Sequence, residues 1–163
     1  MAAAEPPPPT PSATVVPLRE RVGGGLEVLL VLRSDAVRYG GMWAFPGGRV
    51  EDGDRQAGDD GAGLDAARRT AVREAAEEVG LAFPPAGLVP FSHWTGGAGG
   101  GRGRRFAAWY FLAPAPPGTV AVDGAELVDH RWIGPAEAVA ARDRGEVPLV
   151  APIWMTLTAL SAG

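Results

Sequence analysis

Residues 73–81 read Arg-Glu-Ala-Ala-Glu-Glu-Val-Gly-Leu, and this stretch decides how the rest of the chain is interpreted. In a helix, Glu74, Glu77 and Glu78 stand at i, i+3 and i+4, so their carboxylates share one face. Gly80 suits the left-handed position just past a helix end. Carboxylates are unfavourable near the negative end of the helix dipole unless a cation compensates them. A hard divalent cation such as Mg²⁺ is the best candidate, because it prefers oxygen ligands.

A second stretch, residues 45–54, reads FPGGRVEDGD. Its tight Gly47-Gly48 turn is followed by acidic residues, an order that can bring backbone carbonyls and carboxylates around one metal ion. The alternative is a solvated acidic surface, on which Arg73 and Glu77 form an ordinary i, i+4 ion pair. The presence of both stretches favours the metal site.

Together these stretches resemble the Nudix box, in which a Gly, five residues, a Glu and seven residues precede Arg-Glu-apolar-any-Glu-Glu-any-Gly-apolar. Gly48 opens the pattern here and residues 73–81 close it. The chain departs from the pattern twice, because Asp54 takes the first Glu position and eighteen residues separate it from Arg73. The resemblance covers nearly the whole chain beyond the N-terminal tail. It implies a hydrolase that cleaves a pyrophosphate bond with the help of Mg²⁺ or Mn²⁺.

The resemblance also implies roles for individual residues. The expected metal ligands are three carboxylates and one backbone carbonyl: Glu74, Glu77, Glu78 and Gly47. Glu74 is alternatively the general base. Arg73 is expected to lie against Asp54 and to hold the loop on the helix, although Asp reaches less far than the usual Glu.

Residues outside the box are candidates for substrate contacts. Arg104 and Arg105, together with Arg102, form a basic group whose guanidinium geometry suits phosphate. The alternative is a solvated loop. Trp94 and its neighbour His93 are candidates for lining the pocket, and a packed aromatic beside a hydrogen-bonded His is the alternative.

Further acidic residues are candidates for catalysis. Glu51 and Asp52 either join a second metal site or belong to a solvated turn. Glu126 or Asp129 either supplies a general base, as the resemblance suggests for this region, or is a surface acid beside a strand.

Two groups of segments bear on the identity of the substrate. Residues 29–34 (LLVLRS), 45–48 (FPGG) and 70–75 (TAVREA) are similar to the signature of coenzyme A diphosphatases. The SHWT, RRF, ELVDHRW and GEVPLV segments are similar to a Nudix subgroup with long insertions that includes CoA-cleaving enzymes. The resemblance therefore implies CoA or an acyl-CoA as the leading substrate. ADP-ribose, a nucleotide sugar or a dinucleotide stays open.

Composition limits the class of protein. A chain of 163 residues is expected to form one domain with a buried core. The net charge of −4 argues against a surface that binds nucleic acid, but it permits small phosphorylated substrates. The chain has no cysteine, which excludes disulfides, thiolate metal sites and a cysteine nucleophile. No signal peptide or membrane span is apparent, so a cytoplasmic location is expected. Monomer and homodimer both stay open.

The expected domain organisation is a short tail and one domain. Residues 1–12, MAAAEPPPPTPS, are proline-rich and are predicted to be a disordered tail. Residues 13–163 are predicted to form the single Nudix domain. Residues 55–63, RQAGDDGAG, are predicted to be a mobile loop that absorbs the extra length of the box.

Hydrophobic patterning predicts strands interleaved with helices. Strands are expected over 13–19, 26–32, 105–113 and 127–133, and helices over 64–79, 135–142 and 152–161. This order indicates an α+β domain. The resemblance implies the Nudix α/β/α sandwich with a mixed β-sheet.

Functions of another class stay in view. A catalytically silent Nudix-fold module would bind a nucleotide without cleaving it, although such a protein would usually lose one of the paired Glu residues. An isopentenyl-diphosphate isomerase shares part of the fold but needs a reactive cysteine, which this chain lacks.

Overall fold

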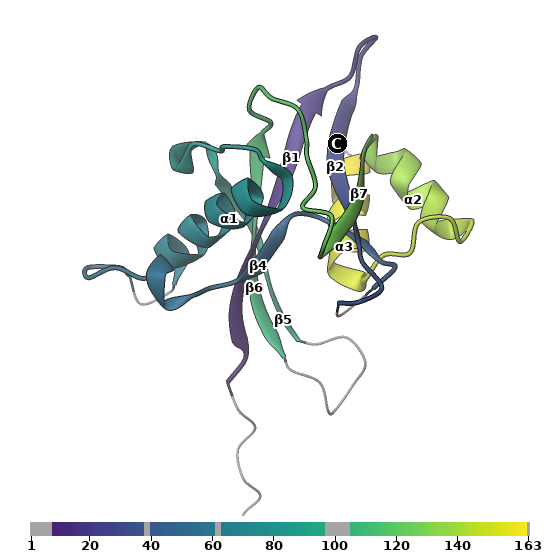
Figure 1. Cartoon of the computed structure of the whole chain (residues 1–163). Helices are drawn as coiled ribbons and strands as arrows, with labels where there is room; N and C mark the ends of the chain where they lie inside the picture. Colours follow the sequence, from purple (N-terminus) through teal and green to yellow (C-terminus); the bar gives the residue numbers. More distant parts are fainter. Residues whose placement is uncertain (1–7, 38–39, 61–62, 97–104, 163) are drawn as a thin grey trace, which may run out of the picture.

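The computed structural model of the chain describes residues 8–37, 40–60, 63–96 and 105–162 (Figure 1). Its strands are β1 (Thr10–Glu20), β2 (Leu26–Arg33), β3 (Trp43–Ala44), β4 (Gly47–Arg49), β5 (Val89–Gly96), β6 (Phe106–Pro114) and β7 (Leu127–Ile133). Its helices are α1 (Leu64–Val79), α2 (Pro135–Asp143) and α3 (Ala151–Ser161), with short 3₁₀ turns η1 (Asp52–Asp54) and η2 (Pro85–Gly87).

One mixed sheet runs through the middle of the domain. Its strands lie in the order β3-β2-β1-β6-β5, while β4 also pairs with β1 and β7 with β2. The β1–β6 pair is parallel and the other pairs are antiparallel. Helix α1 covers one face, and α2 and α3 cover the other (Figure 1). The predicted α/β/α sandwich with a mixed sheet is therefore confirmed.

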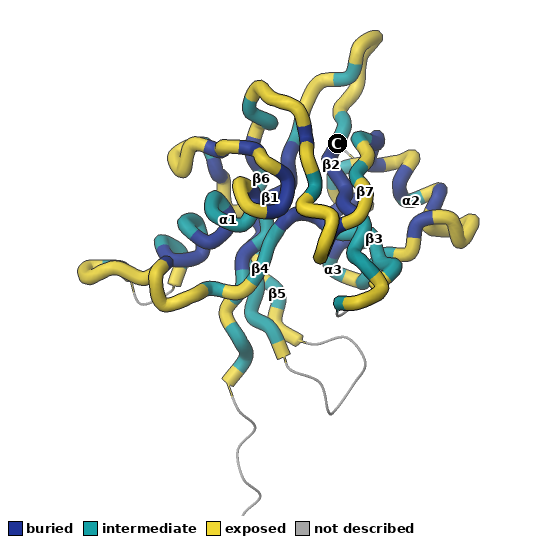
Figure 2. The backbone as a smooth tube through the Cα atoms, in the orientation of Figure 1, coloured by how far each residue is buried: buried dark blue, intermediate teal, exposed yellow. Residues whose placement is uncertain are grey.

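The alternation of side chains along the strands divides the core into two parts. Leu29 and Val31 of β2 point toward the α1 side, whereas Val28 and Leu30 point toward α2 and α3. All four are at most 1% exposed. Because helices cover both faces, the middle of β2 is a continuous apolar run, and Figure 2 shows the centre of the sheet as buried.

Helix α1 lies close to the sheet because its inner face is made of small side chains. Ala67, Ala71, Ala75 and Val79 follow each other at four-residue spacing and are at most 1% exposed. The helix ends at Gly80, whose φ of 71° is the left-handed conformation that glycine adopts at low cost. The predicted bounds of this helix, 64–79, are confirmed.

The boundary predicted for the N-terminal tail needs correction. Strand β1 begins at Thr10, so residues 10–12, which were assigned to a disordered tail, belong to the sheet. They pair with β6 on one side, and Ser12 pairs with Arg49 of β4 on the other. Proline fits at Pro11 because this stretch lies at the start of the strand. None of the helices in the described ranges has the length and apolar character needed to cross a membrane.

Candidate functional site

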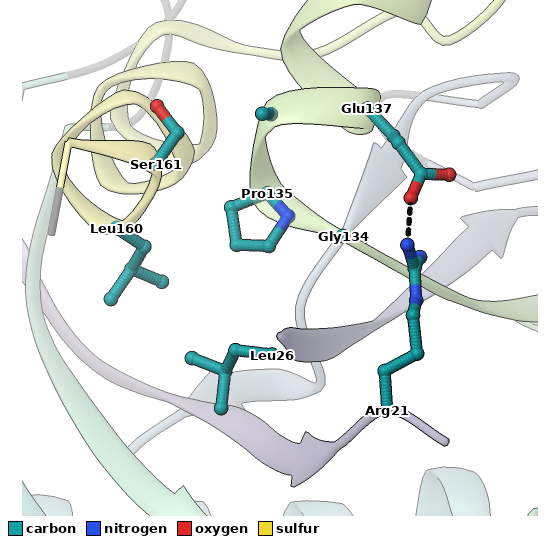
Figure 3. A pocket seen from close by; sticks show the side chains of 8 residues that line it. Arg21, Leu26, Gly134, Pro135, Glu137, Leu160 and Ser161 are labelled. Atoms are coloured by element: carbon teal, nitrogen blue, oxygen red, sulfur yellow. Dashed lines mark ion pairs between the residues drawn. The ribbon is translucent and has the colours of Figure 1, made fainter. Parts of the chain in front are cut away.

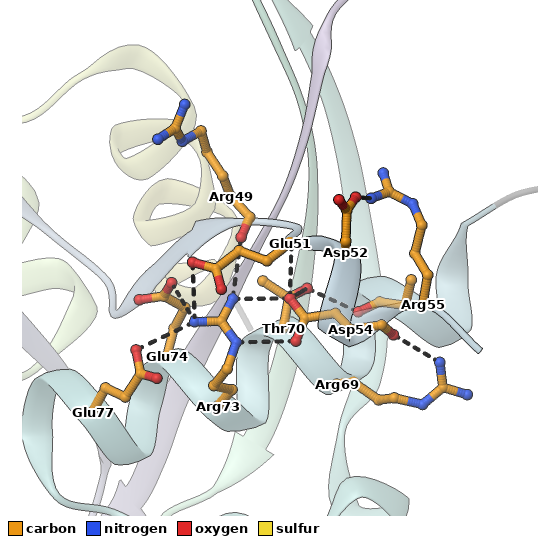
Figure 4. A network of polar contacts seen from close by, with 11 residues as sticks. Arg49, Glu51, Asp52, Asp54, Arg55, Arg69, Thr70, Arg73, Glu74 and Glu77 are labelled. Carbon is orange, nitrogen blue, oxygen red and sulfur yellow. Dashed lines mark hydrogen bonds and ion pairs between the residues drawn. The ribbon is translucent and has the colours of Figure 1, made fainter.

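Asp54 is the centre of a polar network that joins the η1 turn to helix α1 (Figure 4). Arg73 donates to both carboxylate oxygens, from Nε at 3.0 Å and from Nη2 at 2.8 Å. Thr70 Oγ1 and the Glu51 amide each donate to Asp54 Oδ2 at 2.9 Å. The expected contact between Arg73 and Asp54 is present. The shorter side chain reaches Arg73 because the η1 turn places Asp54, only 5% exposed, directly against the helix.

The network changes the acidity of Asp54. The hydrogen bond from Arg73 is the main cause that lowers the pKa of Asp54 from 3.8 to about 2, and burial opposes it only partly. A carboxyl whose pKa is lowered on folding stabilises the fold above its unfolded pKa. That stabilisation is lost as the pH falls through the folded value.

Replacing Asp54 by Asn is expected to lower the free energy of unfolding at pH 7 by about 2 kcal/mol, which is the linkage contribution of this shift. The difference in the free energy of unfolding between wild type and variant should shrink as the pH falls from 4 to 2, because wild-type Asp54 takes up a proton as the pH approaches its folded pKa. Urea denaturation at a series of pH values measures this. Asp143→Asn, which removes an exposed ion pair with Arg142, is the control. A gap of the same size at pH 7 and pH 2 would contradict the assignment.

Glu78 and Glu74 form a pair of carboxyl groups beside β4. Glu78 is 6% exposed, shares a hydrogen bond with Glu74, and accepts another from the Gly47 amide. Burial, and secondarily the neighbouring Glu74, raise the pKa of Glu78 to about 9. A buried carboxyl beside a second one is costly unless a proton or a cation compensates it. The pair therefore fits a hard cation with oxygen ligands.

Glu77 does not join this pair in the structure. Its carboxylate accepts from Arg73 Nη1 at 3.2 Å, and its side chain is 58% exposed. The i, i+4 spacing draws Glu77 toward Arg73, as the solvated alternative expected. Within the described ranges, no three side chains of Asp, Glu, His or Cys are grouped closely enough to hold a metal ion together. The structure thus brings together two of the three expected carboxylate ligands.

The Gly47-Gly48 turn packs directly on this pair and on β1. A Cβ atom on Gly48 would lie 2.5 Å from the carboxyl carbon of Glu74. A Cβ atom on Gly47 would overlap the backbone of Ala13 and lie 2.7 Å from Thr14 Oγ1. Close approach, and not an unusual φ, therefore disfavours a side chain at both positions, most strongly at Gly47, where the Cβ atom would meet backbone.

The Glu74–Glu78 pair lies in the wall of a cavity of about 750 Å³. Its charged lining comes from α1, from residues near β4, from the end of β2 and from the residue just before β7: Glu74, Glu78, Arg49, Glu51, Arg33 and Glu126. Its apolar lining comes mainly from β3, β5, β6 and the start of α3: Trp43, Phe45, Trp94, Phe106, Tyr110 and Ile153. The cavity therefore suits a ligand that carries phosphate groups together with a ring or an apolar arm.

Of the other residues predicted to contact substrate, only some line the cavity. Trp94 lines the cavity, and its indole N–H donates to Ser92 Oγ at 2.9 Å. Its neighbour His93 instead packs against Trp109, with ring centroids 4.7 Å apart. Arg105 is exposed and does not line the cavity, which does not favour the predicted phosphate contact. Arg102 and Arg104 lie outside the described residues.

Of the two acids proposed as a late general base, only Glu126 lines the cavity. The backbone around it is well held. The Glu126 amide donates to Asp123 Oδ1 at 3.1 Å, and its carbonyl accepts from the Ser34 amide at 2.8 Å. Asp129 instead accepts from the His130 amide. Among the acids considered for a second metal site, Glu51 lines the cavity and Asp52 is exposed.

Arg33 and Arg49 are charged cavity residues that sequence reasoning missed. Arg33 stands at the end of β2, and its charge acts on Glu78. Arg49 ends β4, and its backbone carbonyl accepts from Arg73 Nη2 at 3.2 Å. The sequence signal for both is weak, because Arg33 only follows the predicted strand 26–32 and Arg49 only follows the Gly47-Gly48 turn.

The inserted segment is more than a spacer over its described part. Asp59 binds Arg69 of α1 through both oxygens, at 2.9 Å and 2.8 Å, and accepts from the Gln56 amide. These contacts fasten the described part of the insertion to α1, and the mobility predicted for residues 55–63 stays a prediction. Residues 61–62 lie outside the described residues.

A smaller hollow of about 240 Å³ lies elsewhere, between the start of α2 and the end of α3 (Figure 3). The ion pair between Arg21 and Glu137 borders it, and Pro135 and Leu160 line it. It contains no paired carboxyl groups, so the larger cavity is the candidate active site.

Comparison with known proteins agrees with this geometry. The family model described as NUDIX domain matches residues 8–151. A NUDIX hydrolase from Alicyclobacillus acidocaldarius has a similar structure, with a TM-score of 0.82 and 24% identity over 96% of this chain and 92% of that one. No protein with a curated description matches the chain.

Two further solved structures share the fold. The NUDIX domain of NrtR from Shewanella oneidensis, complexed with ADP ribose, has a TM-score of 0.68 and 18% identity over 93% of this chain and 86% of that one. An Ap4A hydrolase from C. elegans has a TM-score of 0.64 and 22% identity over 94% of this chain and 96% of that one.

Proposed function

Since the chain belongs to the Nudix family and is a hydrolase acting on phosphoanhydride bonds, we propose that it cleaves the pyrophosphate of a nucleoside diphosphate derivative at the Glu74–Glu78 pair. The observation that carries this proposal is the buried pair of carboxyl groups in the wall of the large cavity. A bound Mg²⁺ or Mn²⁺ would neutralise charge on phosphoryl oxygens and lower the pKa of a coordinated water.

The residues of the chain have distinct tasks in this proposal. Glu74 and Glu78 supply oxygen ligands, and the Gly47 amide orients Glu78. Glu77 is proposed as a further ligand, for which its side chain must leave Arg73 Nη1, and the Gly47 carbonyl as another. Arg73 keeps the η1 turn on the helix through Asp54.

The proposed substrate is CoA or an acyl-CoA, with ADP-ribose as the alternative. Residues 29–34, 45–48 and 70–75 support CoA by their resemblance to CoA diphosphatases. The apolar lining around Trp43, Trp94 and Ile153 suits a pantetheine or acyl arm. It also suits a stacked base, and a similar structure binds ADP ribose.

A panel assay tests the substrate. The protein is incubated with Mg²⁺ and CoA, acetyl-CoA, ADP-ribose, NADH or Ap4A, and the products are followed by mass spectrometry. The proposal expects 4′-phosphopantetheine, or its acyl form, and adenosine 3′,5′-bisphosphate from CoA substrates. Cleavage of ADP-ribose with CoA left intact would move the assignment to the alternative. Saturable ligand binding without cleavage of any compound would indicate a silent binding module.

Arg33→Ala is expected to raise KM more than it lowers kcat, because we propose that Arg33 binds substrate phosphate. The loss in kcat/KM should be about 10- to 100-fold, the range expected when a charge-assisted hydrogen bond is lost. Arg105→Ala is the matched comparison, since Arg105 does not line the cavity. Steady-state kinetics of both variants measure the effect. A larger KM effect at Arg105 would restore the basic segment before β6 as the phosphate contact.

Glu126→Gln is expected to lower kcat by about 10²-fold or more with a small change in KM, because we propose Glu126 as the general base. Asp129→Asn, on strand β7 directly after Glu126, is the control, since Asp129 does not line the cavity. Equal kcat values for the two variants would remove Glu126 from the mechanism and leave Glu74 as the candidate base.

A further inference from the structure

Residues Asp54 to Asp59 close around the side chain of Arg69. Arg69 Nη1 donates to the backbone carbonyl of Asp54 at 2.9 Å and also to Asp59 Oδ2 at 2.9 Å. Its Nη2 donates to Asp59 Oδ1 at 2.8 Å. The Gln56 amide donates to Asp59 Oδ2 at 2.9 Å, so the loop is closed by its own backbone as well. One guanidinium thus connects the start of the insertion, its middle and helix α1.

Helix α1 therefore holds Asp54 at two different points. Arg69 binds its backbone carbonyl, while Thr70 and Arg73 bind its carboxylate. A substitution at position 59 leaves Thr70 and Arg73 in place as donors to the Asp54 carboxylate. The backbone contact depends on Arg69, whose geometry Asp59 fixes by binding both terminal nitrogens in a planar fork.

The position of Asp54 is transmitted to the paired carboxyl groups over a short path. Arg73 Nη1 donates to Glu74 Oε1 at 3.0 Å and Nη2 donates to the Arg49 carbonyl at 3.2 Å. Gly48 leaves no room beside Glu74, since even a Cβ atom there would lie 2.5 Å from its carboxyl carbon. A shift of the turn toward α1 would therefore displace Glu74.

We propose that the Arg69–Asp59 pair is a positioning device, by which the inserted segment fixes the turn 47–54 on helix α1 and so sets the geometry of the Glu74–Glu78 pair. This inference rests on the proposed function for its catalytic consequence. Arg69 and Asp59 do not line the cavity, so they act through Asp54 and Arg73 and not on the substrate.

The alternative is an ordinary surface ion pair, which would contribute little to the stability of the fold. Two features separate the Arg69–Asp59 pair from that class. Asp59 is only 16% exposed and Arg69 30% exposed, whereas Arg144 and Glu146, which form a pair with two hydrogen bonds elsewhere, are 59% and 58% exposed. Arg69 also binds the backbone carbonyl of Asp54 in the turn.

The test compares Arg69→Ala and Asp59→Asn with Arg144→Ala in the full chain, at a temperature where circular dichroism shows each variant folded. Mn²⁺ affinity is measured by electron paramagnetic resonance without substrate, and hydrogen exchange is measured for the peptide covering 47–54. Arg69→Ala should weaken Mn²⁺ binding about tenfold, as loss of a residue that orients metal ligands does. It should also speed exchange in 47–54 and lower kcat with KM within about twofold. Asp59→Asn should show smaller changes in the same direction, and Arg144→Ala none.

The inference is overturned if Arg69→Ala leaves hydrogen exchange in 47–54 at the wild-type rate, or if it changes KM alone. A wild-type protein that binds no Mn²⁺ would instead contradict the proposed function. The hydrogen-exchange comparison would then still decide whether Arg69 fixes the turn.

Discussion

Glu78→Gln is expected to lower kcat by about 10³-fold while the protein stays folded, since a metal that polarises phosphoryl oxygens contributes several kcal/mol to the transition state. Gln has the size of Glu and can still accept from the Gly47 amide, so the packing around this buried side chain is kept. It cannot act as an anionic ligand beside Glu74. The neutral side chain also removes the cost of burying a second carboxyl group, so the free energy of unfolding should not fall.

The measurement is kcat with saturating Mg²⁺, together with urea denaturation of the same preparations. Glu146→Gln, an exposed acid paired with Arg144, is the matched control and should keep wild-type activity. Wild-type turnover by Glu78→Gln would show that the buried pair is structural and would withdraw the proposed site.

Gly48→Ala and Gly47→Ala are expected to fail in different ways. The methyl group of Gly48→Ala would meet the end of the Glu74 side chain, which can swing aside. The fold should therefore survive, while displacement of Glu74 by about an ångström should cost about 10²-fold in kcat. The methyl group of Gly47→Ala would meet backbone atoms of Ala13 and Thr14, which cannot move without shifting β1. This overpacking should cost about 1–3 kcal/mol in the free energy of unfolding.

Thermal unfolding and kcat measured on both variants separate the two effects. Gly53→Ala is a suitable control, because nothing lies within 4 Å of the added Cβ atom. If Gly48→Ala were as active as wild type, the contact between the turn and Glu74 would have no bearing on catalysis.

Local sequence patterns predicted the parts of the structure that depend on neighbouring residues. The four-residue spacing of small apolar side chains and the position of Gly80 gave helix α1 its correct bounds. The run LEVLLVL predicted β2 as a buried strand, because helices cover both faces of the sheet. The contact between Arg73 and Asp54 followed from the family pattern and survived the replacement of Glu by Asp.

The parts that depend on distant pairing could not be predicted in the same way. Arg33 reaches the cavity because β2 lies beside β1 and β3 in the sheet, an order that the periodicity of one strand does not reveal. Arg69 lies on helix α1 and Asp59 lies in the inserted segment, ten residues away in the chain, and only the closed loop brings the two side chains together. Glu77 shares a helix face with Glu74 and Glu78, but Arg73 competes for its carboxylate. Spacing alone does not decide such a competition.

The most direct test of the central claim is hydrolysis of the best panel substrate in H₂¹⁸O, with Mg²⁺ or with excess chelator, followed by mass spectrometry of both products. Metal-dependent hydrolysis predicts one ¹⁸O atom in one of the two phosphorylated products, formed only when Mg²⁺ is present. Product formation at the same rate in chelator, or products that carry no ¹⁸O, would contradict metal-dependent attack of water on the pyrophosphate.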